Sequence, residues 1–106
     1  MGSKGFSDAV YECCRRVPEG MVTTYGEIAR AIGRPGSSRA VGQSLKRNPY
    51  APRVPCHRVV RSDGTIGGYS GSEKVMIMKK VSILESEGIL VRKNKIEGFE
   101  KRLFRF

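Results

Sequence analysis

The fold of this chain is decided by residues 24–47, which read TYGEIARAIGRPGSSRAVGQSLKR. Thr24 and Glu27 have the spacing of a capping box, in which both side chains accept hydrogen bonds from backbone N–H groups at a helix start. We therefore expect a helix to begin near Tyr25. Apolar residues at positions 28, 29 and 32 would form its buried face, and the glycines and proline of residues 33–36 would end it.

A further helix is expected directly after that turn. Ser37 or Ser38 can cap its start, and Val41 and Leu45 have the spacing of a face turned to the core. Polar and basic residues occupy another face, and the Asn-Pro pair at 48–49 ends the helix. Two short helices joined by a tight turn predict a helix-turn-helix.

Other elements flank this helix pair on either side. Apolar spacing predicts a first helix over residues 7–17, in which Cys13 and Cys14 pack as small apolar side chains. Residues 59–60 and 65–66 have the character of two strands around Asp63-Gly64, a dipeptide typical of tight hairpin turns. A hairpin added to a helix-turn-helix indicates a winged helix.

The last part of the chain continues with one helix and a tail. The helix is predicted over residues 73–87, with Gly88 ending it, and the tail is either a strand pair or a packed extension. The expected fold class is mainly α with a small β wing. We expect one winged helix-turn-helix-like domain over residues 1–106, with a core at 6–88 and a C-terminal extension at 89–106.

Composition narrows the class of partner. The 106 residues include 20 Lys and Arg against 10 Asp and Glu, a formal net charge of +10. This balance favours nucleic acid, although ribosomal-type, membrane-surface and simply basic proteins share it. No apolar stretch is long enough for a membrane span and no signal-peptide pattern is present, so we expect no membrane partner and an intracellular location. Three cysteines form no disulfide framework, and a single histidine leaves no Cys/His set for zinc.

The stretch VPCHRV at residues 54–59 carries the candidate chemistry. It places the thiol of Cys56 beside the imidazole of His57 and the guanidinium of Arg58. A thiol attacks as its thiolate, and a nearby base or positive charge makes that form available near neutral pH. Cys56 is therefore a candidate nucleophile. The alternative is a buried cysteine that packs as a small apolar residue.

Several motifs agree in order and spacing with one known family. They are Pro18-Glu19-Gly20, Thr24-Tyr25-Gly26-Glu27-Ile28-Ala29, Ser38-Arg39-Ala40-Val41-Gly42, Arg47-Asn48-Pro49, Pro55-Cys56-His57-Arg58-Val59 and Gly68-Tyr69-Ser70-Gly71. Together they closely resemble the C-terminal domain of alkylguanine-DNA alkyltransferases, the methylated-DNA-protein-cysteine methyltransferases. The resemblance is dense over about half of the chain.

The resemblance implies a set of catalytic residues. Cys56 would attack the alkyl carbon, and His57 would take the thiol proton through a bridging water. The family places the acid that orients the imidazole just before a glycine, which selects Glu87. The preceding stretch is longer than the familiar pattern by about one helical turn, so Glu85 remains an alternative. Tyr25 would donate a hydrogen bond or a proton to the departing guanine, or else it is a core aromatic.

The resemblance also implies DNA contacts from the second helix of the pair. Arg39 would fill the stack vacated by a flipped nucleotide, with an ordinary phosphate contact as the alternative. The expected DNA-binding residues are Arg39, Ala40, Gly42, Gln43, Lys46 and Arg47. The base pocket and its structural support would come from Leu45, Asn48, Arg58, Val59, Tyr69 and Ser70. Tyr69 and Ser70 would contact the flipped guanine through their backbone N–H groups.

The function implied is direct DNA repair by a monomer that needs no metal or cofactor. An alkyl group, such as methyl, would pass from guanine O6 in double-stranded DNA to Cys56 in a single turnover. One alternative is an alkyltransferase-like protein that recognises the lesion and recruits another pathway, but those relatives lack the nucleophilic cysteine. Another is a winged-helix transcription regulator, which would lack a dimerisation segment and would not explain the cluster at residues 55–58.

Overall fold

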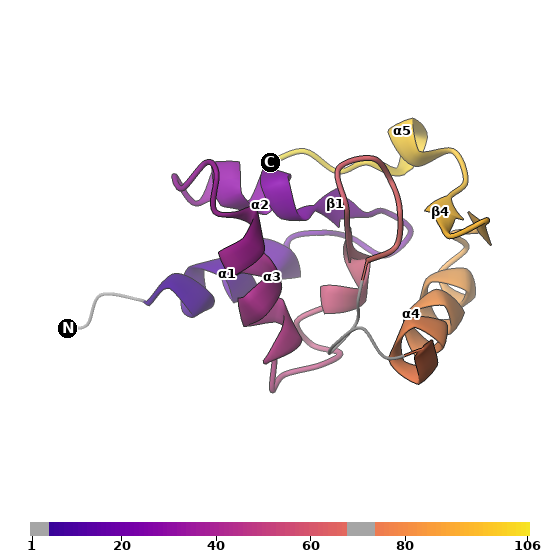
Figure 1. Ribbon diagram of the computed structural model, residues 1–106, viewed down its shortest axis with the longest axis horizontal. Coiled ribbons are helices and arrows are strands. Elements are labelled where there is room, and N and C mark those ends of the chain that lie inside the picture. Colours follow the sequence, from indigo (N-terminus) through magenta and orange to yellow (C-terminus); the bar gives the residue numbers. More distant parts are fainter. Residues whose placement is uncertain (1–4, 68–73) are drawn as a thin grey trace.

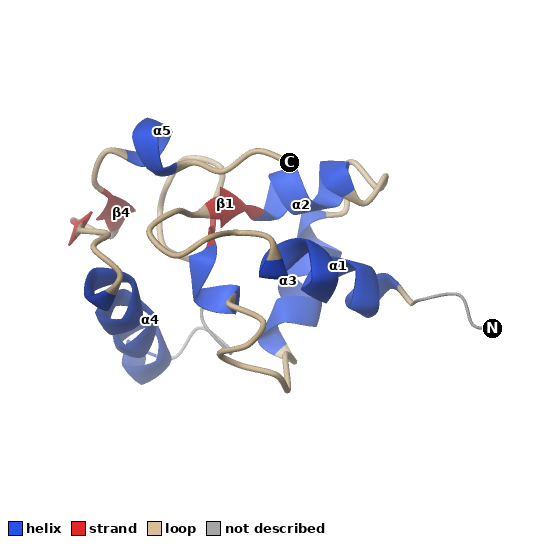
Figure 2. Cartoon of the chain, turned by 180° about the vertical axis from the view of Figure 1, so that it is seen from behind, coloured by secondary structure: helices blue, strands red, loops and turns tan. Residues whose placement is uncertain are grey.

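The structure is a computed structural model, and it describes residues 5–67 and 74–106 (Figure 1). One side of the molecule is formed by three helices: α1 (Phe6–Arg15), α2 (Tyr25–Ala31) and α3 (Ser38–Lys46). The other side holds α4 (Lys74–Ser86) and the antiparallel pair of β3 (Val91–Arg92) and β4 (Lys95–Ile96). Between the two sides lie β1 (Thr23–Thr24), the 3-10 helix η1 (Cys56–Arg58) and β2 (Val59–Val60) (Figures 1 and 2). A short helix, α5 (Phe99–Arg102), precedes the C-terminal segment.

The helix-turn-helix is confirmed as α2 and α3. The hydroxyl of Thr24 accepts a hydrogen bond from the backbone N–H of Glu27 at 3.0 Å, so the threonine half of the capping box forms as expected. The inward residues Ile28 and Val41 are both fully buried, in one apolar cluster with residues of α1. Packing against α1 therefore fixes both helices, which are too short to be stable alone.

The serine cap expected for the next helix differs in detail. Ser37 is the N-cap residue of α3, but its side chain makes no capping hydrogen bond. Its hydroxyl instead donates to the carbonyl of Arg34 at 2.6 Å, within the turn between the helices. The reason is local, because the backbone of Ser37 is not in the extended conformation that turns an N-cap hydroxyl toward the helix.

The predicted hairpin of residues 59–60 and 65–66 is wrong in its pairing. The turn does form, since the backbone N–H of Arg61 donates to the carbonyl of Thr65 at 2.9 Å. However, β2 pairs in parallel with β1, and Thr65 forms an isolated bridge to Lys95. Both residues of β2 are fully buried, which is typical of a core strand and not of a half-exposed wing.

The end of α4 and the tail agree with the sequence pattern. The N–H groups of Gly88 and Ile89 donate to the carbonyls of Glu85 and Leu84, each at 3.0 Å, which is the Schellman arrangement. Gly88 adopts φ +84°, the left-handed conformation that this motif requires. The tail contains both structures expected as alternatives: a strand pair, β3 and β4, and a packed extension after α5.

The interior consists of two apolar clusters. The first lies under α1, α2 and α3 and includes Cys13, Cys14 and Cys56, so the first two cysteines pack as small apolar residues as predicted. The second joins β2, α4 and β4 to the segment before β1, and its buried residues are Val22, Val60, Ile66, Leu84, Ile89 and Ile96. Across the described ranges, no helix has the length and apolar character needed to span a bilayer.

Candidate functional site

Cys56 is the first residue of η1 and comes at the end of the loop that follows α3. The carbonyl of Val54 accepts two hydrogen bonds, from the backbone N–H of Cys56 and from Nδ2 of Asn48, both at 2.8 Å. The N–H of Arg58 closes the 3-10 turn on the carbonyl of Pro55 at 2.9 Å. Asn48 thus fixes the backbone just before the cysteine, whose side chain is 5% exposed.

The carboxylate of Glu87 lies against His57, although the two residues are distant in sequence. Nε2 of His57 is 2.9 Å from Oε2 of Glu87. Arg58 donates to the same carboxylate twice, from Nε at 3.0 Å and from Nη2 at 2.8 Å, and a third hydrogen bond joins its Nη1 to the carbonyl of Val17. Glu85, the alternative acid, is exposed. The arrangement therefore brings His57 to Glu87 and gives that carboxylate a bidentate arginine partner.

These contacts determine the protonation of the imidazole. Burial lowers the pKa of His57 below its ordinary value, and this outweighs the hydrogen bond and charge of Glu87, which raise it; Arg58 and Lys80 lower it further. Burial raises the pKa of Glu87, but hydrogen bonds from Arg58 and His57 lower it more. His57 is therefore neutral at pH 7 beside an ionised carboxylate. Nε2 then carries the hydrogen donated to Glu87, which leaves Nδ1 as the acceptor nitrogen.

Nδ1 of His57 is available as a base. It is buried and has no hydrogen-bond partner among residues 5–67 and 74–106. A buried acceptor without a partner is unusual in a folded protein, and such atoms are concentrated at functional sites. The imidazole can therefore accept a proton at this atom.

Tyr25 occupies the first position of α2, where its ring is half-buried. A Cβ built on Gly67 would lie 3.2 Å from its hydroxyl oxygen, and one built on Gly42 would lie 3.8 Å from its ring. Burial and the neighbouring Cys56 raise the pKa of Tyr25 to about 12, although Arg61 opposes them. The phenol therefore keeps its proton and can act as a donor.

Lys80 is a member of the site that the sequence reasoning missed. Its side chain is 0% exposed, and Nζ donates to the carbonyls of Val59 at 2.7 Å and Ile66 at 2.6 Å. Burial lowers the pKa of Lys80 to about 7, against the charge of Cys56, which raises it. A signal was present in the sequence, because Lys80 precedes Leu84 by four residues and Glu87 by seven, and so shares their helix face.

The outer face of α3 carries the residues expected to contact DNA. The exposed members of that set are Arg39, Ala40, Gln43, Lys46 and Arg47, while Gly42 is half-buried. Leu45 and Val59, expected at the base pocket, are buried in the apolar cluster that contains Cys56. Tyr69 and Ser70 lie outside the described residues.

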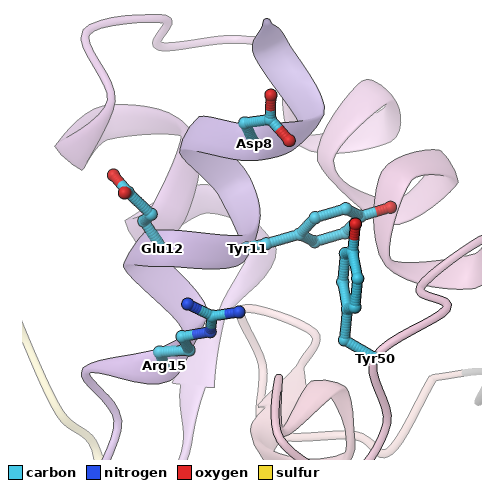
Figure 3. Close-up of a pocket in the computed structure, with 5 residues that line it drawn as sticks. All are labelled: Asp8, Tyr11, Glu12, Arg15 and Tyr50. Carbon is cyan, nitrogen blue, oxygen red and sulfur yellow. The ribbon is translucent and has the colours of Figure 1, made fainter. Parts of the chain in front are cut away.

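A surface pocket lies beside α1 (Figure 3). It is lined by Asp8, Tyr11, Glu12, Arg15 and Tyr50. The rings of Tyr11 and Tyr50 meet edge to face at 5.8 Å, and the hydroxyl of Tyr11 donates to the carbonyl of Ser44 at 2.7 Å. These contacts hold α1 against α3 and against the loop that follows α3. The pocket includes none of the predicted site residues. No group of three or more potential metal ligands occurs in the described part of the chain.

Comparison with known proteins identifies the same family that the motifs indicated. The model of the 6-O-methylguanine DNA methyltransferase DNA-binding domain matches residues 5–89. The family model is thus described as a DNA-binding domain, whereas the motifs were compared above with a C-terminal domain. A methylated-DNA–protein-cysteine methyltransferase of Salmonella typhimurium is 40% identical over 90 residues, which is 85% of this chain and 50% of the relative. The chain therefore spans about half the length of the curated relative.

Two solved structures share the fold. The S. pombe protein Atl1, in complex with damaged DNA containing O6-carboxymethylguanine, is 32% identical with a TM-score of 0.85, and the match covers 100% of both chains. Mycobacterium tuberculosis OGT in complex with DNA is 41% identical with a TM-score of 0.72, over 81% of this chain and 51% of that one. With its helix-turn-helix and its Cys56-His57 pair, this chain belongs to the family of the 6-O-methylguanine DNA methyltransferase DNA-binding domain.

Proposed function

We propose that the chain repairs DNA directly, by moving an alkyl group from O6 of guanine to the sulfur of Cys56. The observation that carries this proposal is the arrangement of His57, which directly follows Cys56 in η1. Its imidazole contacts the carboxylate of Glu87 through Nε2 and keeps Nδ1 as an acceptor. A nucleophile, a base and a group that orients the base form the usual arrangement for covalent catalysis by a thiol. The match to the methyltransferase family supports the substrate.

The proposed transfer step uses the side chains of Cys56, His57 and Glu87 and a water molecule. Nδ1 of His57 accepts the thiol proton through the bridging water, and the resulting imidazolium is stabilised by Glu87. The sulfur then attacks the alkyl carbon, so that a carbon–sulfur bond forms while the bond to O6 breaks and its electron pair stays on guanine. The thioether has no leaving group that water could displace readily, so each molecule reacts once.

Two further side chains act on the departing guanine and the attacking sulfur. Tyr25 supplies a proton or a hydrogen bond to the guanine anion, which its high pKa allows because the phenol is protonated throughout the neutral range. Lys80 is tied to the carbonyls of Val59 and Ile66, and its positive charge favours the thiolate form of Cys56. The neutral phenol of Tyr25 is therefore the proton donor, and the cationic Lys80 is an electrostatic support.

The helix α3 is the proposed DNA contact. Its exposed basic residues add to a chain with a net charge of +10, which favours phosphate neutralisation. An alkylated base inside duplex DNA is accessible to a thiol only after the nucleotide is flipped out, at a cost of a few kcal/mol. Arg39, exposed near the start of α3, fills the vacated place in the stack in this proposal. One copy of the chain, folded as a single domain, acts on one lesion.

Lesion recognition without transfer is the second candidate function. It is favoured by the likeness to S. pombe Atl1 over the full length of both chains. The presence of Cys56 argues against it, since the sequence retains the residue that transfer requires.

Intact-mass measurement separates the two candidates. The protein is incubated with duplex DNA that contains one O6-methylguanine, and binding is measured on the same duplex. Transfer predicts a gain of one methyl group per protein molecule and its loss in Cys56→Ser. Tight binding to the lesion with an unchanged mass would replace repair by recognition.

A further inference from the structure

The C-terminal segment runs back from α5 across the molecule to β1 and α2 (Figure 1, yellow). The N–H of Val22 donates to the carbonyl of Arg102 at 2.9 Å, and the N–H of Phe104 donates to the carbonyl of Val22 at 2.7 Å. The hydroxyl of Thr23 donates to the carbonyl of Phe104 at 2.9 Å. The segment thus adds a strand-like edge to β1, next to the residues that begin α2. It lies beyond residue 89, where the match to the family model ends.

The side chain of Arg102 joins two carbonyls from distant parts of the chain. Nη1 donates to Gly20 at 3.0 Å, and Nη2 donates to Gly88 at 3.0 Å. Gly20 belongs to the turn after α1, and Gly88 directly follows Glu87 at the end of α4. The planar fork of a guanidinium suits such double donation, and its charge is favourable near a helix C-terminus.

Arg58 makes a similar connection through Glu87, the residue before Gly88. Its guanidinium holds the carboxylate of Glu87 and the carbonyl of Val17, as described above. Two arginines therefore connect the end of α4 to the 17–20 turn, one through the side chain of Glu87 and one through the next backbone carbonyl. The approach is close, because a Cβ built on Gly20 would lie 3.8 Å from the carbonyl oxygen of Glu87 and 3.9 Å from Nη1 of Arg102.

We propose that Arg102 is a positioning residue, which holds the end of α4 so that the carboxylate of Glu87 meets Nε2 of His57. Glu87 is the C-cap of its helix, where the backbone leaves helical geometry, so its side chain depends on how the following residue is fixed. Arg58 contacts the side chain of Glu87, whereas Arg102 contacts the backbone that follows it, through the carbonyl of Gly88. The inference rests on the proposed function only in giving this geometry a use in transfer.

The pKa of His57 tests the positioning directly. His57 is the chain's only histidine, so its ring resonances in NMR titrations are unambiguous. Glu87 raises its pKa, whereas the nearby charges of Arg58 and Lys80 lower it. In Arg102→Met, a displaced Glu87 lowers the pKa of His57, by about half a unit or more. Mere removal of a positive charge would raise it, so the two explanations differ in sign.

Three variants make the comparison complete. Arg102→Lys keeps the charge but lacks the fixed fork, and it should lower the pKa of His57 in the same direction as Arg102→Met. Lys101→Met, at an exposed neighbouring position, should leave it unchanged. If Arg102→Met fails to fold, Arg102→Lys carries the test. An unchanged or raised His57 pKa in the folded variants, with or without a loss of thermal stability, would overturn the proposal.

The rate of transfer to Cys56 adds a second readout. Arg102→Met should slow transfer about tenfold at neutral pH, since small displacements of catalytic groups have effects of this size or larger. The acidic limb of its pH profile should move with the His57 pKa. If the parent protein transfers no methyl group, the proposed function fails, while the NMR titration still decides whether Arg102 positions Glu87.

Discussion

The ammonium group of Lys80 lies 6.0 Å from the centre of the Tyr25 ring, inside the protein. Burial acts on the two groups in opposite directions: it raises the pKa of Tyr25 to about 12 and lowers that of Lys80 to about 7. Each group is thereby held closer to its neutral form. The thiol of Cys56 and the phenol of Tyr25 thus have a cation beside them whose charge changes within the physiological range.

Lys80→Met should change how stability depends on pH. The pKa of Lys80 is about 7 in the folded chain and 10.5 when unperturbed, so between these values the unfolded chain binds a proton that the folded chain does not. The free energy of unfolding of the parent therefore rises with pH in this window, by about 1.4 kcal/mol per unit from this group. Urea unfolding at about pH 7 and about pH 9 should show that this contribution is missing in Lys80→Met.

The matched control is Lys79→Met, one position earlier on the same helix but exposed. Its stability should follow that of the parent at every pH. Equal pH slopes for the parent and Lys80→Met would mean that Lys80 has an ordinary pKa in the folded protein.

Glu87→Gln should slow transfer and shift its pH profile. Because Glu87 raises the pKa of His57, its loss lets that pKa fall further. A base that must be neutral then stays neutral to lower pH, so the acidic limb moves to lower pH, while the plateau falls about tenfold or more because the base is weaker. Single-turnover rates on O6-methylguanine duplex DNA measure both effects.

Glu85→Gln provides the comparison for that variant, since Glu85 is exposed two residues away. It should behave like the parent in rate and pH profile. A kinetic defect in Glu85→Gln with none in Glu87→Gln would mean that the contact between His57 and Glu87 has no part in transfer. Thermal unfolding of both variants separates a lost helix contact from a lost orienting group.

Alkylation should be confined to Cys56 among the three cysteines. Cys14 is fully buried, and burial raises its pKa, as it also does for Cys13, so neither provides a thiolate near pH 7. Peptide mass mapping after reaction should find the methyl group on Cys56 alone. Cys56→Ser should bind lesion DNA without gaining mass, and a methyl group on Cys13 would contradict the assignment of the nucleophile.

Arg39→Ala should affect duplex DNA more than the free base. If Arg39 fills the vacated stack, its loss should reduce transfer from duplex DNA by about tenfold or more, because unstacking costs a few kcal/mol. Transfer from free O6-methylguanine, which needs no flipping, should change little. Equal loss on both substrates would make Arg39 a structural residue.

Arg47→Ala is the control for phosphate binding, since Arg47 is also exposed, just after α3. It should weaken binding to all sequences and reduce the salt dependence of affinity by about one counterion. A fall of the salt slope in Arg39→Ala, without a specific loss of transfer from duplex DNA, would make Arg39 an ordinary phosphate contact.

Local signals in the sequence were enough to predict the helix-turn-helix and the end of α4. The cap at Thr24 and the glycine that ends α4 depend only on near neighbours, and both form as predicted. The strand of Val59 and Val60 was harder, because its partner is 36 positions earlier, at Thr23 and Thr24. The Asp63-Gly64 turn was correctly placed, yet a turn fixes direction and does not decide which strand supplies the hydrogen bonds.

The candidate site shows the same limit. Cys56, His57 and Tyr25 were identifiable through motifs, and the geometry brings Glu87 rather than Glu85 to the imidazole. Lys80 was missed because a lysine in a helix usually faces solvent, and here the carbonyls of Val59 and Ile66 accept hydrogen bonds from its buried ammonium group. Such compensation comes from other segments and is invisible in the local pattern.

The pairing of the C-terminal segment with β1 has a consequence for biosynthesis. The hydrogen bond from Thr23 to Phe104 joins positions 81 residues apart, and that from Arg102 to Gly20 joins positions 82 apart. A chain emerges from the ribosome with its N-terminus first, so α2 and α3 can form while the residues that brace Glu87 have not yet been translated. A nascent chain therefore presents its basic helix before the contacts of Arg102 exist, and those contacts can form only after residue 102 has been translated.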